Sequence, residues 1–265
     1  MRNSSECESS GLEMEHGTVL CRRRRGIFRK PGLLTVLDDF SIKILPGECV
    51  GLVGTSGCGK STVGRCLAGL QKLHRGRILL RGTPLEEMRR KEFHGAVQMV
   101  FQSPAEALDP RQTVHAAIAE PISIHFRREN SSRREDRIRQ LMGAVYLDAD
   151  LLWRKPAELS GGQRQRVAIA RALAVCPEYL ICDEVVSALD AAVRTEIVEL
   201  LRAMQRSNHL GILFISHDLS VVRRLCSRVV SMEPCRLQPA VNFSKTPLTA
   251  EKNITPCHPQ DGAAW

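Results

Sequence analysis

One glycine-rich stretch has the residue types and spacing of a phosphate-binding loop. Residues 54–61 read Gly-Thr-Ser-Gly-Cys-Gly-Lys-Ser and fit the pattern G-x-x-x-x-G-K-[ST]. Glycines let such a backbone curl so that its N–H groups point toward an anion. Lys60 can then reach the β- and γ-phosphates of a nucleotide, and the Ser61 hydroxyl can ligate Mg²⁺. The residues predicted to bind nucleotide here are Gly54, Thr55, Ser56, Gly57, Cys58, Gly59, Lys60, Ser61 and Thr62.

The segments on either side supply the context that such a loop requires. Residues 48–53 predict a buried strand, and residues 60–70 predict a helix with Val63, Leu67 and Leu70 on one face. The N-terminus of that helix adds positive potential where the phosphates would lie. A glycine-rich turn that binds nothing is the alternative, and the strand and helix at its two ends argue against it.

Two further apolar strands end in polar side chains. Residues 179–182 are followed by Asp183 and Glu184, and residues 212–215 are followed by Ser216 and His217. Continuous apolar strands between helices indicate a parallel sheet that is covered on both faces. Such sheets bind ligands outside the carboxyl ends of their strands, so we expect Lys60, Asp183, Glu184 and His217 to converge.

These side chains suit the hydrolysis of a nucleotide. Asp183 can hold Mg²⁺, while Glu184 can orient and deprotonate the attacking water. His217 can contact the γ-phosphate, and Gln102, after a predicted strand at 97–101, can ligate Mg²⁺ or the water. Each residue alone has an ordinary alternative: an Asp-Glu pair is usually a solvated turn, and a histidine at a strand end is more often structural.

The composition is that of an ordinary soluble globular protein and excludes few functions. The chain has 265 residues, 43% of them hydrophobic, which is ordinary for a soluble protein with a sizeable core. Its ten cysteines contain no Cys-x-x-Cys pair, and we expect a reducing compartment with Cys49, Cys58, Cys66 and Cys182 packed in the interior. The net charge of +9 would permit nucleic acid or anionic lipid as a partner, although solvated basic faces are the simpler interpretation. No secretory signal or 18-residue apolar span is evident.

The rest of the chain divides into a leader, a core region, a helical region and a tail. Residues 1–17 look like a loose leader, and residues 103–158 look like an inserted helical subdomain. Ser160 is the expected N-cap of another helix. The other expected strands are 18–21, 33–37, 40–45 and 77–80, and the expected helices are 112–126, 133–147, 164–175 and 191–205.

Residues 159–163 read Leu-Ser-Gly-Gly-Gln, and with this segment the sequence resembles the ATP-binding cassette (ABC) ATPases over about 33–232. The resemblance implies an α/β P-loop NTPase fold with a mostly parallel sheet, an N-terminal antiparallel β portion and the helical subdomain. The cassette domain would then cover 18–232, and 233–265 would be an irregular tail. ATP and Mg²⁺ are the implied cofactors.

The same resemblance implies a head-to-tail dimer of cassettes. In it Ser160, Gly161, Gly162 and Gln163 of one chain would close over the γ-phosphate that the other chain holds. Asp190 would belong to the loop that links the two sites. Phe28 falls where the family has the aromatic residue that stacks on adenine.

Shorter segments narrow the resemblance to the peptide/nickel importer branch. Residues 98–104 and 108–111 look like that branch, and residues 147–148, 155–156, 172–175 and 224–229 look most like its nickel-import ATP-binding subunit. Residues 186–190 lean toward the dipeptide and oligopeptide subunits. The branch implies a second, different ATPase subunit, two membrane permease subunits and an extracytoplasmic solute-binding protein as partners, with no nucleic acid. It also implies a peripheral position on the cytoplasmic face of the inner membrane. A cassette ATPase that is not a transporter is the remaining alternative.

Overall fold

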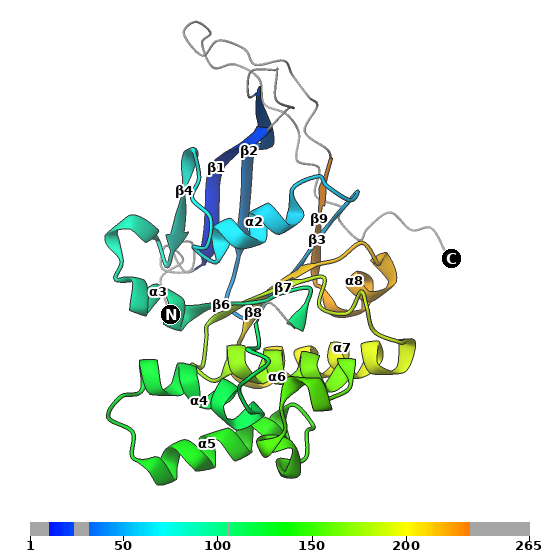
Figure 1. The fold of residues 1–265 in the computed structure, drawn as a ribbon. Coiled ribbons are helices and arrows are strands. Elements are labelled where there is room, and N and C mark those ends of the chain that lie inside the picture. The colour runs from blue at the N-terminus through cyan, green and yellow to red at the C-terminus, as the bar shows by residue number, and fades with distance from the viewer. Residues whose placement is uncertain (1–10, 24–31, 105–106, 234–265) are drawn as a thin grey trace, which may run out of the picture.

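A computed structural model describes residues 11–23, 32–104 and 107–233. Two sheets and the helices that pack against them build the fold (Figure 1). The strands are β1 (Leu12–Arg23), β2 (Gly32–Ile44), β3 (Cys49–Gly54), β4 (Arg75–Leu80), β5 (Thr83–Pro84), β6 (Val97–Val100), β7 (Tyr179–Asp183), β8 (Gly211–Ile215) and β9 (Arg228–Met232). The α-helices are α2 (Lys60–Leu67), α3 (Arg90–Ala96), α4 (Val114–His125), α5 (Ser131–Ala144), α6 (Gly161–Leu173), α7 (Ala191–Asn208) and α8 (Leu219–Leu225). The short 3-10 helices are η1 (Leu85–Glu87), η3 (Ala149–Trp153) and η4 (Pro156–Glu158).

The larger sheet is parallel and has the strand order β6-β7-β8-β3-β9. The smaller sheet, in the order β2-β1-β4-β5, is antiparallel. The expected fold class, a mostly parallel sheet with an N-terminal antiparallel portion, is confirmed.

Side chains of the parallel sheet alternate between two hydrophobic cores. On β8, Ile212 and Phe214 enter the core that α4 to α8 line, whereas Leu213 and Ile215 enter the core shared with α2 and the antiparallel sheet. Successive side chains of a strand point to opposite faces, so a continuous apolar strand fills both cores. Figure 1 shows the result, with the helices α4 to α7 on one side of the sheet and α2 on the other.

The expected leader is wrong where it overlaps the first strand. Strand β1 begins at Leu12, and Leu12 and Met14 are fully buried while Glu13 and Glu15 form ion pairs outside the core. This alternation is the period-2 signal of a half-buried strand. Met14 lies opposite Ile42 on β2 and Ile78 on β4, so residues 11–17 belong to the fold.

The first helix after the glycine-rich loop is shorter than expected. It ends at Leu67 because Gly69, with φ of +70°, turns the chain, and the N–H groups of Gly69 and Leu70 bond back to Cys66 and Arg65. Leu70 is therefore 54% exposed, and its expected place on the buried face is wrong. The helices α3 and α8 were not expected at all, because each has only seven residues and shows less than two helical turns of pattern.

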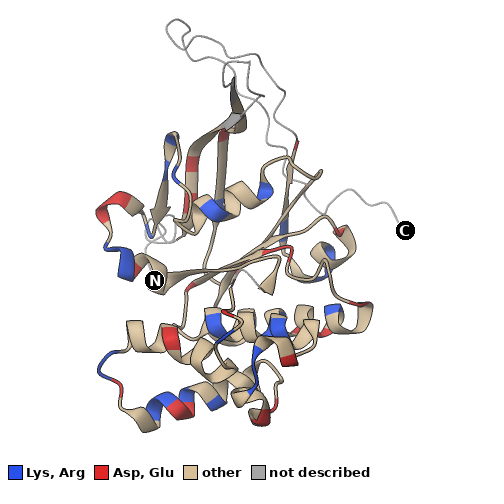
Figure 2. Ribbon diagram, viewed as in Figure 1, with Lys and Arg blue, Asp and Glu red and all other residues tan. Residues whose placement is uncertain are grey.

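Charges of both signs are interspersed along the helical layer (Figure 2). Several of them pair, for example Arg137 with Glu129 at 2.9 Å and Arg171 with Glu120 at 2.8 Å. Within the described residues, no helix is both long enough and apolar enough to cross a membrane. The tail at 234–265 lies outside the described residues.

Candidate functional site

The glycine-rich loop joins the end of β3 to the start of α2. Its glycines at 54, 57 and 59 have φ of +155°, +79° and +104°, a region that favours glycine. At two of them the backbone also passes close to other chain segments: a Cβ on Gly54 would lie 2.4 Å from the Met232 carbonyl oxygen, and one on Gly59 would lie 2.8 Å from that of Val36. The tip of the loop, 55–57, is exposed, so its backbone can reach an anion.

Lys60 is the buried cation of this loop. Its side chain is only 5% exposed, and its Nζ donates hydrogen bonds of 2.8 Å to the carbonyl oxygens of Gly54 and Thr55. The neighbouring Cys58 side chain is buried and lies 3.8 Å from the same nitrogen. These partners are carbonyl oxygens and a thiol rather than a carboxylate, an arrangement that suits a side chain that binds polyphosphate.

A hydroxyl and a carboxylate meet beside the loop. Ser61, in the first turn of α2, donates to Asp183 Oδ1 at 3.0 Å, and Asp183 is 4% exposed at the end of β7. Mg²⁺ is usually held by one or two such oxygens together with substrate phosphates and water. The Ser61 hydroxyl and the Asp183 carboxylate are oxygen ligands of the kind such a metal uses, so this pair fits a Mg²⁺ that arrives with a nucleotide. Thr62, the next residue of α2, is half-buried.

Glu184 lies at the centre of a second cluster. Its Oε2 accepts a hydrogen bond from Gln102 Nε2 at 3.2 Å, and its Oε1 lies 3.5 Å from His217 Nδ1. These residues follow β7, β6 and β8, whose carboxyl ends the parallel pairing brings to one edge. The structure thus brings together the strand-end residues that the sequence singled out.

The backbone at Glu184 is in an unusual conformation that its neighbours fix. Its φ is +48°, in the left-handed region that non-glycine residues rarely adopt. Its N–H donates to the Ile215 carbonyl at 3.0 Å, and its own carbonyl accepts from Ser187 Oγ at 2.9 Å. Such strain persists only where surrounding contacts hold it, and it is found mostly at functional positions.

The segment 159–163 forms the N-terminus of α6, and Ser160 is its N-cap as expected. Ser160 Oγ accepts from the Gln163 N–H at 3.2 Å, and Gln163 Oε1 accepts from the Ser160 N–H at 2.9 Å. This reciprocal capping box satisfies two N-terminal donors within the helix itself. Ser160 and Gly161 are exposed, whereas Gly162 faces Val193 of α7.

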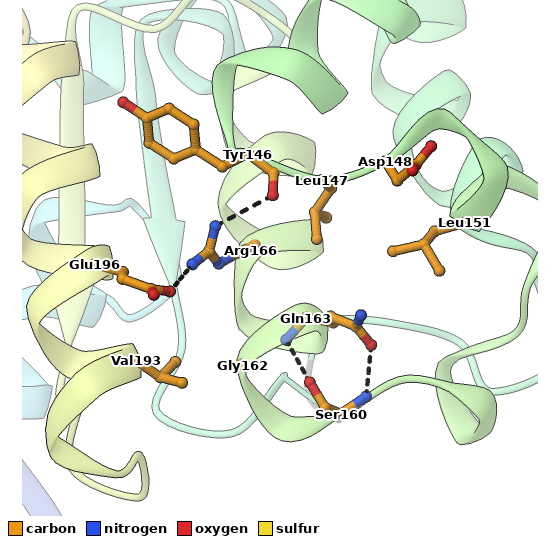
Figure 3. Close-up of a pocket in the computed structure, with 10 residues that line it drawn as sticks. All are labelled: Tyr146, Leu147, Asp148, Leu151, Ser160, Gly162, Gln163, Arg166, Val193 and Glu196. Atoms are coloured by element: carbon orange, nitrogen blue, oxygen red, sulfur yellow. Dashed lines mark hydrogen bonds and ion pairs between the residues drawn. The ribbon is translucent and has the colours of Figure 1, made fainter.

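A pocket of about 380 Å³ lies beside this helix end (Figure 3). Its most connected residue is Arg166, which the sequence reasoning missed. The guanidinium bonds the carbonyls of Val145 and Tyr146 and pairs with Glu196 of α7. A helical arginine in a basic sequence gives no signal of its own, because only the packing shows that this side chain is half-buried and bonds two other helical segments. The pocket is lined by Tyr146, Leu147, Asp148, Leu151, Ser160, Gly162, Gln163, Arg166, Val193 and Glu196.

The structure describes one of the two remaining predicted site residues, Asp190, but not the other, Phe28. Asp190 is exposed and caps α7, since its Oδ1 accepts from the N–H groups of Ala192 and Val193. The family resemblance predicts that Asp190 lies in the loop that links the two ATP sites of a dimer, and it does not predict this capping role. Phe28 lies outside the described residues.

Known proteins share both the sequence and the fold. The profile of the ABC transporter family matches residues 37–187. The oligopeptide transport ATP-binding protein OppF of Bacillus subtilis is 42% identical over 224 residues, which cover 82% of this chain and 73% of that protein. The nickel import ATP-binding protein NikE of Escherichia coli is 43% identical over 201 residues, covering 75% of each.

The match to another oligopeptide transport protein, AppF of Bacillus subtilis, is 43% identical but spans 64% of that relative's length. A solved structure of the dimeric ATP-binding cassette MJ0796, bound to ADP and Pi, superposes with a TM-score of 0.74 at 25% identity. It covers 88% of this chain and 100% of the cassette. The chain therefore belongs to the ABC transporter family and carries the ATP-hydrolysing domain of that family.

Proposed function

We propose that this chain is the ATP-binding and ATP-hydrolysing subunit of an importer that takes up nickel. The observation that carries the ATPase part is the set of three contacts at one sheet edge: Ser61 with Asp183, and Glu184 with Gln102 and with His217. Their positions match the division between a metal-holding pair and a water-activating group.

In this proposal the loop at 54–61 wraps the phosphates, and Lys60 exchanges its two carbonyl partners for phosphate oxygens. Ser61 and Asp183 would hold Mg²⁺, which neutralises developing charge on the phosphates. Glu184 takes a proton from water while the water oxygen bonds to the γ-phosphorus and the bond to the bridging oxygen breaks. Gln102 and His217 hold the Glu184 carboxylate in place for that step.

The exposed N-terminus of α6 suits a second chain. A helix N-terminus favours an anion, and Ser160 and Gly161 present it to solvent. We propose that it closes over the γ-phosphate of an opposing cassette in a head-to-tail dimer, with Asp190 near the interface. The dimeric cassette with which the fold superposes supports this arrangement. The opposing cassette would be a different chain, and two permease subunits would hold both cassettes at the cytoplasmic face of the membrane.

Cargo is the least constrained part of the proposal. The nickel-import and oligopeptide relatives have nearly the same identity, 43% and 42%, so identity does not separate them. The nickel assignment rests on the short segments at 147–148, 155–156, 172–175 and 224–229. Dipeptide or oligopeptide import is the second candidate, which residues 186–190 favour.

Deleting the gene and measuring uptake tests the cargo. Loss of labelled nickel uptake with normal growth on dipeptides would support nickel, and the reverse result would assign the chain to peptide import. Complementation with Glu184→Gln is the matched control, because it restores the subunit without its proposed base.

Membrane fractionation tests the transport role itself. The chain should sediment with membranes only when the permease subunits are present, and a chain that never sediments with them would favour an ATPase outside transport.

A further inference from the structure

Two cysteine thiols from distant parts of the sequence face each other at the parallel sheet. The Sγ atoms of Cys49 and Cys226 lie 3.5 Å apart, although 177 residues separate them. Cys49 is the first residue of β3 and is fully buried, whereas Cys226 ends α8 and is half-buried. Neither residue takes part in the proposed ATP site.

The backbone on both sides of this pair is fixed. Ser227, next to Cys226, donates from its N–H and its Oγ to the Cys49 carbonyl at 2.9 and 3.1 Å. The parallel pairing of β3 with β9 then begins at Val50, opposite Arg228. The pairing of strands therefore fixes the backbone around the two cysteines, while the side-chain rotamers set the distance between their sulfurs.

The neighbourhood is also packed closely. A Cβ on Gly51 would lie 2.4 Å from Val222 Cγ1 and 3.2 Å from Cys226 Sγ, so glycine lets the end of α8 approach β3. A disulfide needs an S–S distance of about 2.05 Å, so the sulfurs would have to approach by roughly 1.5 Å. Rotation about the two Cα–Cβ bonds can supply most of a movement of that size.

We propose that Cys49 and Cys226 form a reversible disulfide when the protein meets hydrogen peroxide. Cys226, the more exposed thiol, reacts first: it takes one oxygen atom from peroxide, and the products are a sulfenic acid and water. The Cys49 sulfur then attacks the Cys226 sulfur, the S–S bond forms, and the hydroxyl leaves as water with the Cys49 proton. Two thiols and one peroxide thus become one disulfide and two waters.

The surroundings favour this order of events. The hydrogen bond to Cys226, followed by burial, raises the pKa of the Cys49 thiol, so it stays protonated and unreactive until its neighbour is oxidised. Cys182, fully buried on β7, is a competitor to consider, because a charge on Cys226 raises the pKa of the Cys182 thiol as well as that of Cys49. Its burial removes it from direct contact with peroxide.

The cross-link would join Cys49, at the start of β3, to Cys226, directly after α8. Strand β3 leads into the glycine-rich loop, and α8 follows His217. Closing so long a loop restricts the unfolded chain and stabilises the folded one. The oxidised protein should therefore melt at a higher temperature, and a dithiol reductant should reverse the shift. This expectation does not depend on the ATPase proposal.

Peptide mapping of the full-length chain tests the proposal. Reduced protein would be treated with peroxide, its remaining thiols blocked by iodoacetamide, and the protein digested without reductant. We expect a linked peptide pair that contains Cys49 and Cys226 and that disappears after dithiothreitol. Cys226→Ser and Cys49→Ala should each abolish the pair and the melting shift, while Cys176→Ser, which removes an exposed thiol elsewhere, should leave both unchanged.

Three results would overturn the proposal. One is a Cys226 sulfenic acid, trapped by dimedone, that accumulates without the linked peptide. Another is a link from Cys226 to Cys182 in place of Cys49. The third is a link from Cys226 that persists in Cys49→Ala. The mapping of the wild-type chain decides the question even if a variant does not fold.

Discussion

The two ends of the proposed ATPase machinery are built in opposite ways. At the sheet edge, side chains from different strands bond one another: Ser61 with Asp183, and Gln102 with Glu184. At the start of α6, Ser160 and Gln163 cap the helix by bonding each other, and Ser160 is exposed. The first region is assembled from several segments of one chain, whereas the second is an exposed helix end.

This difference implies that only the second region needs another chain in order to contact a nucleotide. Contacts between strands can place a base and a metal ligand with no second chain, so the sheet edge should bind nucleotide in the isolated subunit. The self-capped N-terminus of α6 would bind a phosphate only when an opposing chain carries the nucleotide to it. Variants of the sheet edge should therefore change binding or chemistry, and variants of α6 should first change stability and assembly.

The largest effect is expected at Glu184. Glu184→Gln keeps the size of the side chain but removes the proton acceptor, so hydrolysis by the assembled complex should fall by roughly 10²–10⁴-fold. ATP occupancy should stay close to that of the wild type. Glu199→Gln is a matched control, because Glu199 is an exposed glutamate on α7 that pairs with Arg224. Hydrolysis at the wild-type rate in Glu184→Gln would show that another base acts, and His217 would be examined first.

The next effect is expected at Lys60. Lys60→Ala removes the buried cation of the loop, and hydrogen bonds to a charged group contribute about 1.5–3 kcal/mol. ATP should bind the isolated subunit roughly 10–100-fold more weakly, as measured by calorimetry. Lys72→Ala, at an exposed lysine outside the loop, should leave the affinity unchanged. Unchanged affinity in Lys60→Ala would mean that the loop does not bind phosphate as proposed.

Neighbouring glycines of α6 should differ in their tolerance of a methyl group. A Cβ on Gly162 would lie 2.6 Å from Val193 Cγ1, and a β-branched neighbour cannot easily rotate away. Gly162→Ala should lower the free energy of unfolding by about 1–3 kcal/mol. Gly161→Ala meets no atom within 4 Å and should be neutral or stabilising by up to about 1 kcal/mol.

Denaturant unfolding of the two glycine variants provides the measurement. Adding Val193→Ala to Gly162→Ala should recover part of the loss, since it removes the methyl group that the new Cβ meets. Equal stability of the two single variants would contradict the close packing of α6 on α7.

A smaller effect is expected at the cap of α6. Ser160→Ala leaves the Gln163 N–H without its acceptor and should cost about 1 kcal/mol of stability. Ser160→Asn keeps an acceptor at the cap and should cost less. In neither variant should ATP bind the isolated subunit differently, and a change there would place Ser160 in the chain's own nucleotide site.

The smallest expected effect is a difference in how stability depends on pH. It distinguishes the charged Asp218 cap of α8, next to the sheet edge, from the neutral Ser160 cap of α6. Asp218 caps α8 just after His217, and the hydrogen bond from the Ser220 hydroxyl lowers the pKa of its carboxyl group. A depressed pKa means that this stabilisation is present above the unfolded pKa of about 3.9 and is lost as pH falls through the folded value. The neutral Ser160 cap has no such dependence.

Unfolding of Asp218→Asn should therefore differ from the wild type by less than about 0.5 kcal/mol near pH 7, because Asn and Asp are similar caps. The variant should lose less stability than the wild type between pH 5 and pH 3. Identical acid profiles would show that the Asp218 charge does not stabilise α8.

Much of the proposed site was evident from the sequence because its signals are local. The glycine-rich loop, the apolar strands before Asp183 and His217, and the Ser160 cap each depend on neighbours within a few residues. Continuous apolar strands then imply a parallel sheet, and a parallel sheet implies one shared edge. The convergence of Lys60, Asp183, Glu184 and His217 required no further information.

Tertiary structure decided the features that depend on residues far apart. The polar composition of residues 1–17 predicts a loose leader, and only pairing with β2 and β4 shows that Leu12 and Met14 are buried. Leu70 fits a helical stripe, but Gly69 ends the helix first. The Arg166 contacts and the facing thiols of Cys49 and Cys226 join segments that no periodicity relates. Such contacts follow from how the helices pack and how the strands are ordered, which a local pattern does not encode.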